Sequence, residues 1–177
     1  MSKNHGLVRA FARGKLLAFF MAPLLPAGMA LAEEREPLAV IELGVAAEWA
    51  LDGGSSFGPS AAVEFPVIKN WLEVETGVQT LFKHGQTEWD ADFVFKKPFD
   101  LSPTVEFEPG IGPVWIHTIS GGRTTNAIGA EAVAHFMFWP TPDRNYGWVL
   151  EPSYTYSFGA GHEQSFGVSV GLVIPIK

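Results

Sequence analysis

Residues 71–82 read WLEVETGVQTLF; the valines of this stretch fall on even positions and its carboxylates on odd positions. Residues 87–97, TEWDADFVFKK, repeat the alternation, with aromatic residues on odd positions and carboxylates on even ones. Successive side chains of a β-strand point to opposite faces of the sheet. The pattern therefore predicts a sheet with one apolar face and one acidic, small-residue face. The class of function depends on which face points outward.

The first part of the chain has the pattern of a secretory signal peptide over residues 1–32. Four Lys and Arg residues precede an apolar run at 16–29, and Ala-Leu-Ala at 30–32 forms a small-residue exit. The alternative is an uncleaved membrane anchor, but the run is short for a span and contains two prolines. We then expect a charged lead-in at 33–37 and one β-barrel domain at 38–177.

Removing the predicted signal peptide makes the remaining chain strongly acidic. The whole sequence has 12 Lys and Arg and 19 Asp and Glu; cutting after Ala32 leaves eight basic residues against nineteen acidic ones, a formal charge of −11. Such a charge argues against a nucleic-acid partner. The chain has no cysteine, which excludes disulfides and a lipidated N-terminal Cys. No helix-length apolar segment follows Ala32, so any crossing of a membrane would be by strands.

Turn-forming residues divide the predicted domain into regularly spaced runs. Gly, Pro, Asn and Asp punctuate them at short intervals, which is typical of an antiparallel meander. A meander of this many strands favours an eight-stranded up-and-down barrel, because closure removes both exposed edges. The runs are roughly 9 to 15 residues long, close to the length that a tilted strand needs to cross a bilayer. They cover residues 38–50, 57–65, 71–82, 87–97, 104–117, 124–138, 147–158 and 165–176.

Two kinds of barrel fit this meander. A soluble, lipocalin-like barrel in the periplasm would turn its apolar face inward around an apolar ligand, whereas a membrane barrel would turn that face to lipid. In the last run Ser165, Gly167, Ser169 and Gly171 alternate with large apolar residues, and small side chains suit the concave interior of a narrow barrel. The small, acidic face is therefore predicted to lie inside, with the apolar face toward lipid.

Aromatic residues near the ends of the runs support the membrane alternative. Rings at both ends of an apolar band are typical of the interfacial girdles of membrane barrels, although a soluble barrel also has core aromatics. The rings in question are Trp49, Phe65, Trp71, Trp89, Trp115, Phe138, Trp139, Trp148 and Phe158.

The alternation, the run lengths and the C-terminus together resemble the small outer-membrane barrels of Gram-negative bacteria, the OmpA, OmpX and OmpW kind. Residues 169–176, SVGLVIPI, match the polar-x-Gly-x-x-hydrophobic-x-hydrophobic form of their assembly signal. The chain departs from that form by ending on Ile176 and Lys177 instead of an aromatic residue, and by Pro175 in the last strand. The resemblance implies an outer-membrane location, contact with membrane lipid and lipopolysaccharide, and recognition of the C-terminal strand by the barrel-assembly machinery.

The acidic parity places many carboxylates and few bases in the predicted lumen. Carboxylates this close together require water, cations or shared protons. One interpretation is a narrow passage for small solutes, with a preference for cations; the other is a wet polar plug, which the narrow interior of eight strands favours. The predicted lumen residues are Glu42, Glu64, Glu73, Glu75, Asp90, Asp92, Lys96, Glu106, Glu108, Glu131, His135 and Glu151, with Glu48 and Glu88 on the same parity.

The remaining polar residues give weaker signals. No histidine pair has metal-ligand spacing, so we predict neither a cofactor nor a structural metal. Lys83, His84, Arg123 and His162 lie in turns that would face outward, where they would meet lipopolysaccharide phosphates or simply keep the turns soluble.

A lipid A-modifying enzyme is a third class of function for a barrel of this membrane. It needs a serine, a histidine and an acid at the outer rim. His117 with Ser120, or His162 with Glu163 and Ser165, supply these residue types. Spacing alone does not define a triad, so we predict no enzyme.

Overall fold

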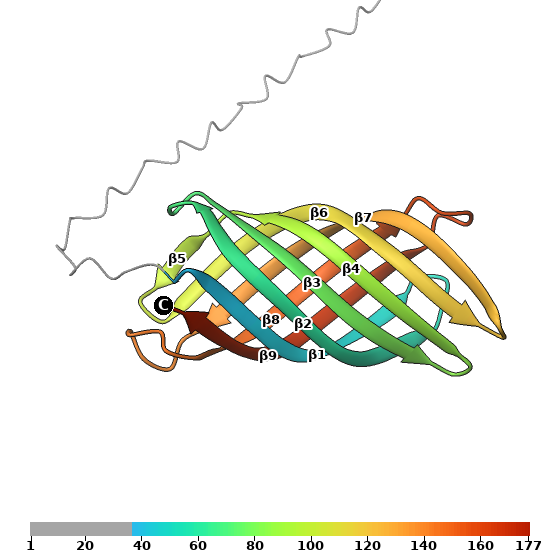
Figure 1. Cartoon of the computed structure of the whole chain (residues 1–177), viewed down its shortest axis with the longest axis horizontal. Coiled ribbons are helices and arrows are strands. Elements are labelled where there is room, and N and C mark those ends of the chain that lie inside the picture. Colours follow the sequence, from blue (N-terminus) through green and yellow to red (C-terminus); the bar gives the residue numbers. More distant parts are fainter. Residues whose placement is uncertain (1–36) are drawn as a thin grey trace, which may run out of the picture. The chain divides into compact units, whose positions relative to one another are not determined.

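The computed structural model describes residues 37–177, which contain nine β-strands and their connections (Figure 1). The predicted signal peptide and all but the last residue of the predicted lead-in lie outside the described residues. The strands are β1 (Ala39–Ala50), β2 (Ser55–Ile68), β3 (Leu72–Lys83), β4 (Gln86–Lys96), β5 (Phe99–Ser102), β6 (Val105–Ser120), β7 (Arg123–Phe138), β8 (Gly147–Ser157) and β9 (Gln164–Ile176).

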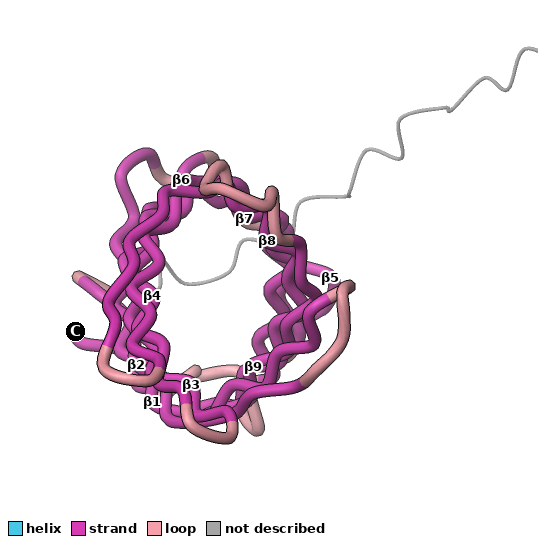
Figure 2. Tube along the Cα trace, turned by 90° about the vertical axis from the view of Figure 1, so that its right-hand side faces the viewer, coloured by secondary structure: helices cyan, strands magenta, loops and turns pink. Residues whose placement is uncertain are grey.

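Eight of these strands close into an antiparallel up-and-down barrel, which confirms the predicted fold class. Each strand of the barrel pairs with the next one in sequence, except that β4 pairs with β6 and not with β5. The barrel closes where β1 pairs with β9, from Ala39↔Ile176 to Ala50↔Ser165. Figure 2 shows the strands as a closed ring. Closure satisfies the backbone donors and acceptors of the strands without an open edge.

The short strand β5 differs from the sequence-based expectation of a plain connection at residues 98–103. It pairs with the first residues of β6, with Phe99 opposite Phe107. β6 extends beyond the last paired residue of β4, Lys96, which pairs with Gly110. β5 therefore covers backbone of β6 that β4 is too short to reach.

The two ends of the barrel differ in what they carry. One, here named the turn end, has the connections at 51–54, 84–85, 121–122 and 158–163. The other, the terminal end, has the connections at 69–71, 97–104 and 139–146 and the C-terminus (Figure 1). Gly121 and Gly122 have φ of 56° and 78°, which allows the two-residue turn between Ser120 and Arg123.

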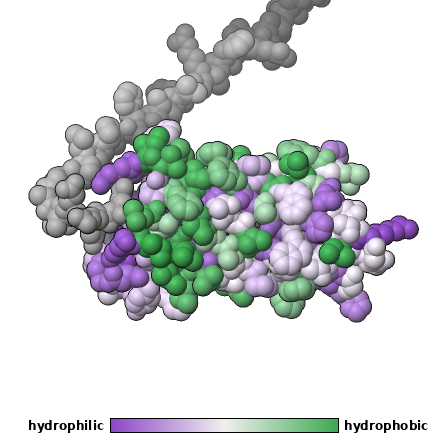
Figure 3. Space-filling model, viewed as in Figure 1, coloured by the Kyte–Doolittle hydropathy of each residue, from purple (hydrophilic) through white to green (hydrophobic). Residues whose placement is uncertain are grey.

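The apolar parity faces outward and the acidic parity inward. Leu43 and Val170 are 52% and 45% exposed, whereas Glu64 and Glu108 are 1% and 0% exposed. On the side of the barrel that Figure 3 shows, hydrophobic residues gather over the terminal half, paler residues lie over the turn half, and hydrophilic residues lie at both ends. Among the described residues no helix is long and apolar enough to cross a membrane.

The interior also contains large apolar side chains, which the small-residue pattern did not predict. A buried cluster fills the barrel toward the terminal end, named here the apolar cluster: Val40, Met137, Trp139, Val149 and Val173. The expectation that Trp139 belongs to an outer aromatic ring is wrong, because this residue is only 5% exposed. Trp139 directly follows Phe138, the last residue of β7. Consecutive residues of an extended chain point to opposite faces, so Phe138 faces lipid and Trp139 faces the interior.

Candidate functional site

Lys96 lies at the centre of the barrel interior and joins three carboxylates. Its Nζ is 3.1 Å from Glu64 Oε2 and 3.5 Å from Glu151 Oε2, and it also pairs with Glu75; its own side chain has no exposed surface. Gly110, opposite Lys96 on β6, leaves room for it: a Cβ on Gly110 would lie 2.9 Å from Cγ of Lys96. The last residue of β4 thus becomes the principal buried cation of the lumen.

His135 extends this ion-pair network to two further strands. Its Nδ1 lies 2.8 Å from both Lys96 Nζ and Glu151 Oε2, and its Nε2 lies 3.3 Å from Glu42 Oε1. Side chains from β1, β2, β3, β4, β7 and β8 therefore meet at one level of the barrel. We name Lys96, His135, Glu42, Glu64, Glu75 and Glu151 the central network. It fills the cross-section with paired charges.

At the terminal end, a second set of contacts joins the β7–β8 connection to β5 and β6. Arg144, in the β7–β8 connection, donates to Glu106 Oε2 at 2.9 Å and to Asp100 Oδ1 at 2.6 Å. Its guanidinium also lies 5.7 Å from the ring centre of Trp139, a member of the apolar cluster. The central network and the apolar cluster together occupy the terminal half of the lumen.

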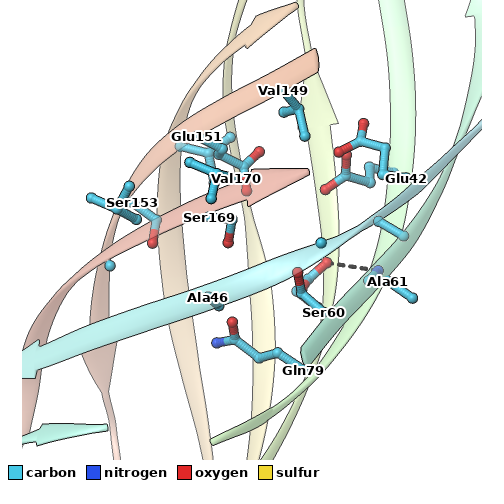
Figure 4. Close-up of a pocket in the computed structure, with 18 of the residues that line it drawn as sticks. Glu42, Ala46, Ser60, Ala61, Gln79, Val149, Glu151, Ser153, Ser169 and Val170 are labelled. Atoms are coloured by element: carbon cyan, nitrogen blue, oxygen red, sulfur yellow. Dashed lines mark hydrogen bonds between the residues drawn. The ribbon is translucent and has the colours of Figure 1, made fainter. Parts of the chain in front are cut away.

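Toward the turn end, the acids are held by neutral donors. Gln79 Nε2 donates to Asp90 Oδ2 at 2.9 Å, and Thr118 Oγ1 donates to Glu88 Oε2 at 2.9 Å. A cavity of about 50 Å³ lies next to the central network, and Figure 4 shows the side chains of Glu42, Glu151, Gln79 and Ser60 around it.

The mouth at the turn end holds a wider space. This cavity has a volume of about 290 Å³ and is lined by acids, including Glu48, Glu88 and Glu163, together with Lys83. The lumen is thus open and acidic at the turn end and narrows to the central network.

Comparison with solved structures identifies this architecture. The Neisserial surface protein A (NspA) superposes with a TM-score of 0.62 at 14% identity, over 78% of this chain and 96% of NspA. The chain has the fold of a small outer-membrane β-barrel. Ail, the attachment invasion locus protein of Yersinia pestis, gives a TM-score of 0.55 at 15% identity, over 79% of this chain and 99% of Ail. No protein-family model and no curated sequence matches the chain. At these identities the likeness concerns the fold alone.

In this outer-membrane barrel fold, all the predicted lumen residues lie on the inner parity and are buried or half-buried. The structure brings half of them together in the central network. The others lie above or below it, and the passage or plug role of the set remains a prediction. Arg144 and the apolar cluster were missed. Arg144 is in an irregular connection with φ of 45°, where strand parity gives no information.

The residues predicted to contact lipopolysaccharide lie at the turn end. Cross-strand pairs Lys83↔Gln86, Gln86↔Ser120 and Ser120↔Arg123 place Lys83 and Arg123 on one side of the mouth, and His84 is in the turn next to Lys83. His162 lies in the β8–β9 connection, with its ring 5.9 Å from that of Tyr156.

The serine and histidine pairs considered for an enzyme do not meet. His117 Nδ1 lies 2.8 Å from Asn126 Oδ1, and its ring lies 5.3 Å from that of Trp115 on the outer face. Within the described part of the chain, no hydrogen bond joins His117 to Ser120. None joins His162 to Ser165, which is buried on the inner face.

Proposed function

We propose that the protein is an integral outer-membrane protein whose closed barrel has a structural role and carries no solute. The observation that carries the proposal is the distribution of side chains: apolar residues cover the outside, while the inside holds the central network. A barrel in water would expose Leu43 and Val170 to solvent at high cost, whereas lipid accommodates them. The alternative of a soluble, lipocalin-like barrel requires the reverse arrangement.

Cell fractionation tests the location. After expression in a Gram-negative host, we expect the protein in the outer-membrane fraction, resistant to washing with high salt or alkaline carbonate. In detergent the folded barrel should migrate differently from the boiled chain on a gel. Recovery in the osmotic-shock fluid would contradict the proposal and support the soluble alternative.

Conductance measurements in planar bilayers test the closed lumen. Beside the central network lies a cavity of about 50 Å³, and the apolar cluster packs on the terminal side of the barrel. We therefore expect no stepwise conductance in potassium chloride, with a wide porin as the positive control. Discrete cation-selective steps from the wild-type protein would support the passage interpretation and overturn the structural one.

For the turn end we propose a contact with lipopolysaccharide phosphates through Lys83, His84 and Arg123, with His162 on the other side of the mouth. Arg and Lys suit phosphate oxygens, and the fold neighbour Ail has been crystallised in complex with sucrose octasulfate, a heparin analogue. Replacing Lys83 and Arg123 together by Ala should weaken lipopolysaccharide binding, most clearly at low salt. Unchanged binding would contradict this contact and would mean that these residues serve only to keep the turns soluble.

We also propose that β9 carries the signal for the barrel-assembly machinery and that the protein has no lipid-modifying activity. Support for the signal comes from SVGLVIPI at residues 169–176, which form most of β9.

Overexpression tests the absence of lipid-modifying activity, and should leave the mass spectrum of lipid A unchanged. Loss or gain of an acyl chain by lipid A would contradict the structural role and support an enzymatic one.

A further inference from the structure

Three carboxylates gather in the terminal half of the lumen, where one acid of the central network meets two acids outside it. They come from β2, β3 and β6: one oxygen each of Glu64, Glu73 and Glu108, all within 4.8 Å of one another. Glu73 is the second residue of β3 and only half-buried, so the group is reached from the terminal end. We name these residues the carboxylate triad.

Glu108 is the member that the protein itself leaves without a partner. It has 0% exposure, and within residues 37–177 no donor group hydrogen-bonds to either of its carboxylate oxygens; its close polar neighbours are the carboxyl groups of Glu64 and Glu73. A buried charged group without a partner is strongly unfavourable, so such a group requires neutralisation by something that binds to it. Its carboxylate is aimed at Glu64 and Glu73, which adds two further negative charges.

The nearby cations are engaged mostly with acids outside the triad. Lys96 divides its single charge among Glu64, Glu75 and Glu151. Arg144 pairs with Glu106 and Asp100. No ion pair of residues 37–177 reaches Glu73 or Glu108, and the triad therefore has a large excess of negative charge.

We propose that the carboxylate triad binds one divalent cation of the size of calcium. Two oxygens on opposite sides of Ca²⁺ lie about 4.8 Å apart, since Ca–O bonds are about 2.3–2.6 Å long. One oxygen from each member of the triad is therefore close enough to the others to contact the same ion. Carboxylates bind Ca²⁺ with one or both oxygens, and the half-buried position of Glu73 admits the ion together with the waters that complete its shell. Ca²⁺ tolerates an irregular shell, which suits three side chains of which only Glu73 is open to water, whereas Mg²⁺ demands a stricter octahedron with bonds of about 2.0–2.1 Å.

Calcium titration of the whole chain, folded in detergent and freed of metal with EDTA, tests this inference. Calorimetry with calcium chloride should give one site per chain, and the thermal unfolding midpoint should rise with calcium, because a ligand that binds only the folded state stabilises it. Glu108→Gln preserves the side-chain shape but removes the charge, so calcium affinity should fall about tenfold or more. Glu131→Gln is the matched control: another inner carboxylate, which accepts a hydrogen bond from Thr155 and lies outside the triad.

The outcomes separate cation binding from the alternatives. No calcium heat and no shift of the midpoint in the wild-type protein would overturn the proposal, and would mean that protons neutralise the triad. An equal calcium response in wild type and Glu108→Gln would also overturn it, by placing the ion elsewhere. If Glu108→Gln does not fold, the more exposed Glu73→Gln takes its place, with the same expected loss. These readouts do not depend on cellular location or conductance.

Discussion

Replacing Lys96 by methionine removes the cation at the centre of the lumen and leaves an apolar chain of similar length. Glu64, Glu75 and Glu151 would then lose their shared partner, while their side chains stay only 2%, 5% and 16% exposed. Breaking a buried ion pair from one side costs about 3–5 kcal/mol, because the remaining charge stays in a medium of low polarity. With three carboxylates on one ammonium, we expect the free energy of unfolding to fall by an amount in this range.

Lys97→Met is the matched control, because the adjacent residue points to the other face. Lys97 Nζ lies 5.8 Å from the ring centre of Trp71 and 5.2 Å from that of Phe99. An exposed cation–π contact contributes about 0.5–1 kcal/mol, so Lys97→Met should cost far less than Lys96→Met. Urea unfolding in lipid or detergent, followed by tryptophan fluorescence and checked in the refolding direction, measures both.

Acid should reduce the difference between Lys96→Met and the wild type. Protonated carboxyl groups need no cation, so the variant gains relative stability as pH falls, while the wild type loses the attraction between Lys96 and its partners. A loss of less than about 1 kcal/mol for Lys96→Met, equal to that for Lys97→Met, would refute the central role of the network.

Substitutions at three positions of β9 test the faces and the packing of the barrel. Val170→Arg places a charge on the lipid-facing surface and should cost about 2–4 kcal/mol and block assembly, whereas Ser169→Asn on the inner face should be tolerated; equal effects on the yield of folded protein would contradict the face assignment. Gly171→Val should lower the unfolding free energy by about 1–3 kcal/mol through overpacking. The reason is that a Cβ at Gly171 would lie 2.6 Å from the carbonyl oxygen of Leu43 and 2.9 Å from Gly44 Cα. If Gly171→Val were as stable as Ser169→Ala, the result would argue against this close contact.

Strand parity was enough to predict the barrel and the direction of its side chains. Alternation with a period of two is a local property of the sequence. The inner and outer residues of each strand could therefore be assigned from that strand alone. Glu73 and Glu75 in β3, and Asp90 and Asp92 in β4, lie on the face that alternation assigns to them.

Which inner residues meet was not predictable, since that depends on the register between strands. Lys96 lies opposite Glu73 in the β3–β4 pairing, yet its ammonium reaches Glu64, two strands away, and Glu151, across the lumen. Trp139 and Arg144 lie in or beside a connection, where no period exists to assign a face. The partners of these two residues follow from the curvature of the closed barrel.

The pairing of β1 with β9 has a consequence for the order of folding. Every other neighbouring pair lies close in sequence, but Ala39 meets Ile176, so this pairing has the highest sequence separation of the molecule. Local hairpins form early, while a contact between the first and last strands waits for the whole chain and bears the entropy of the longest loop. Until that moment two strand edges stay exposed and able to aggregate. Closure is therefore the late, all-or-none step, and a chain cut short before β9 has no native state to reach.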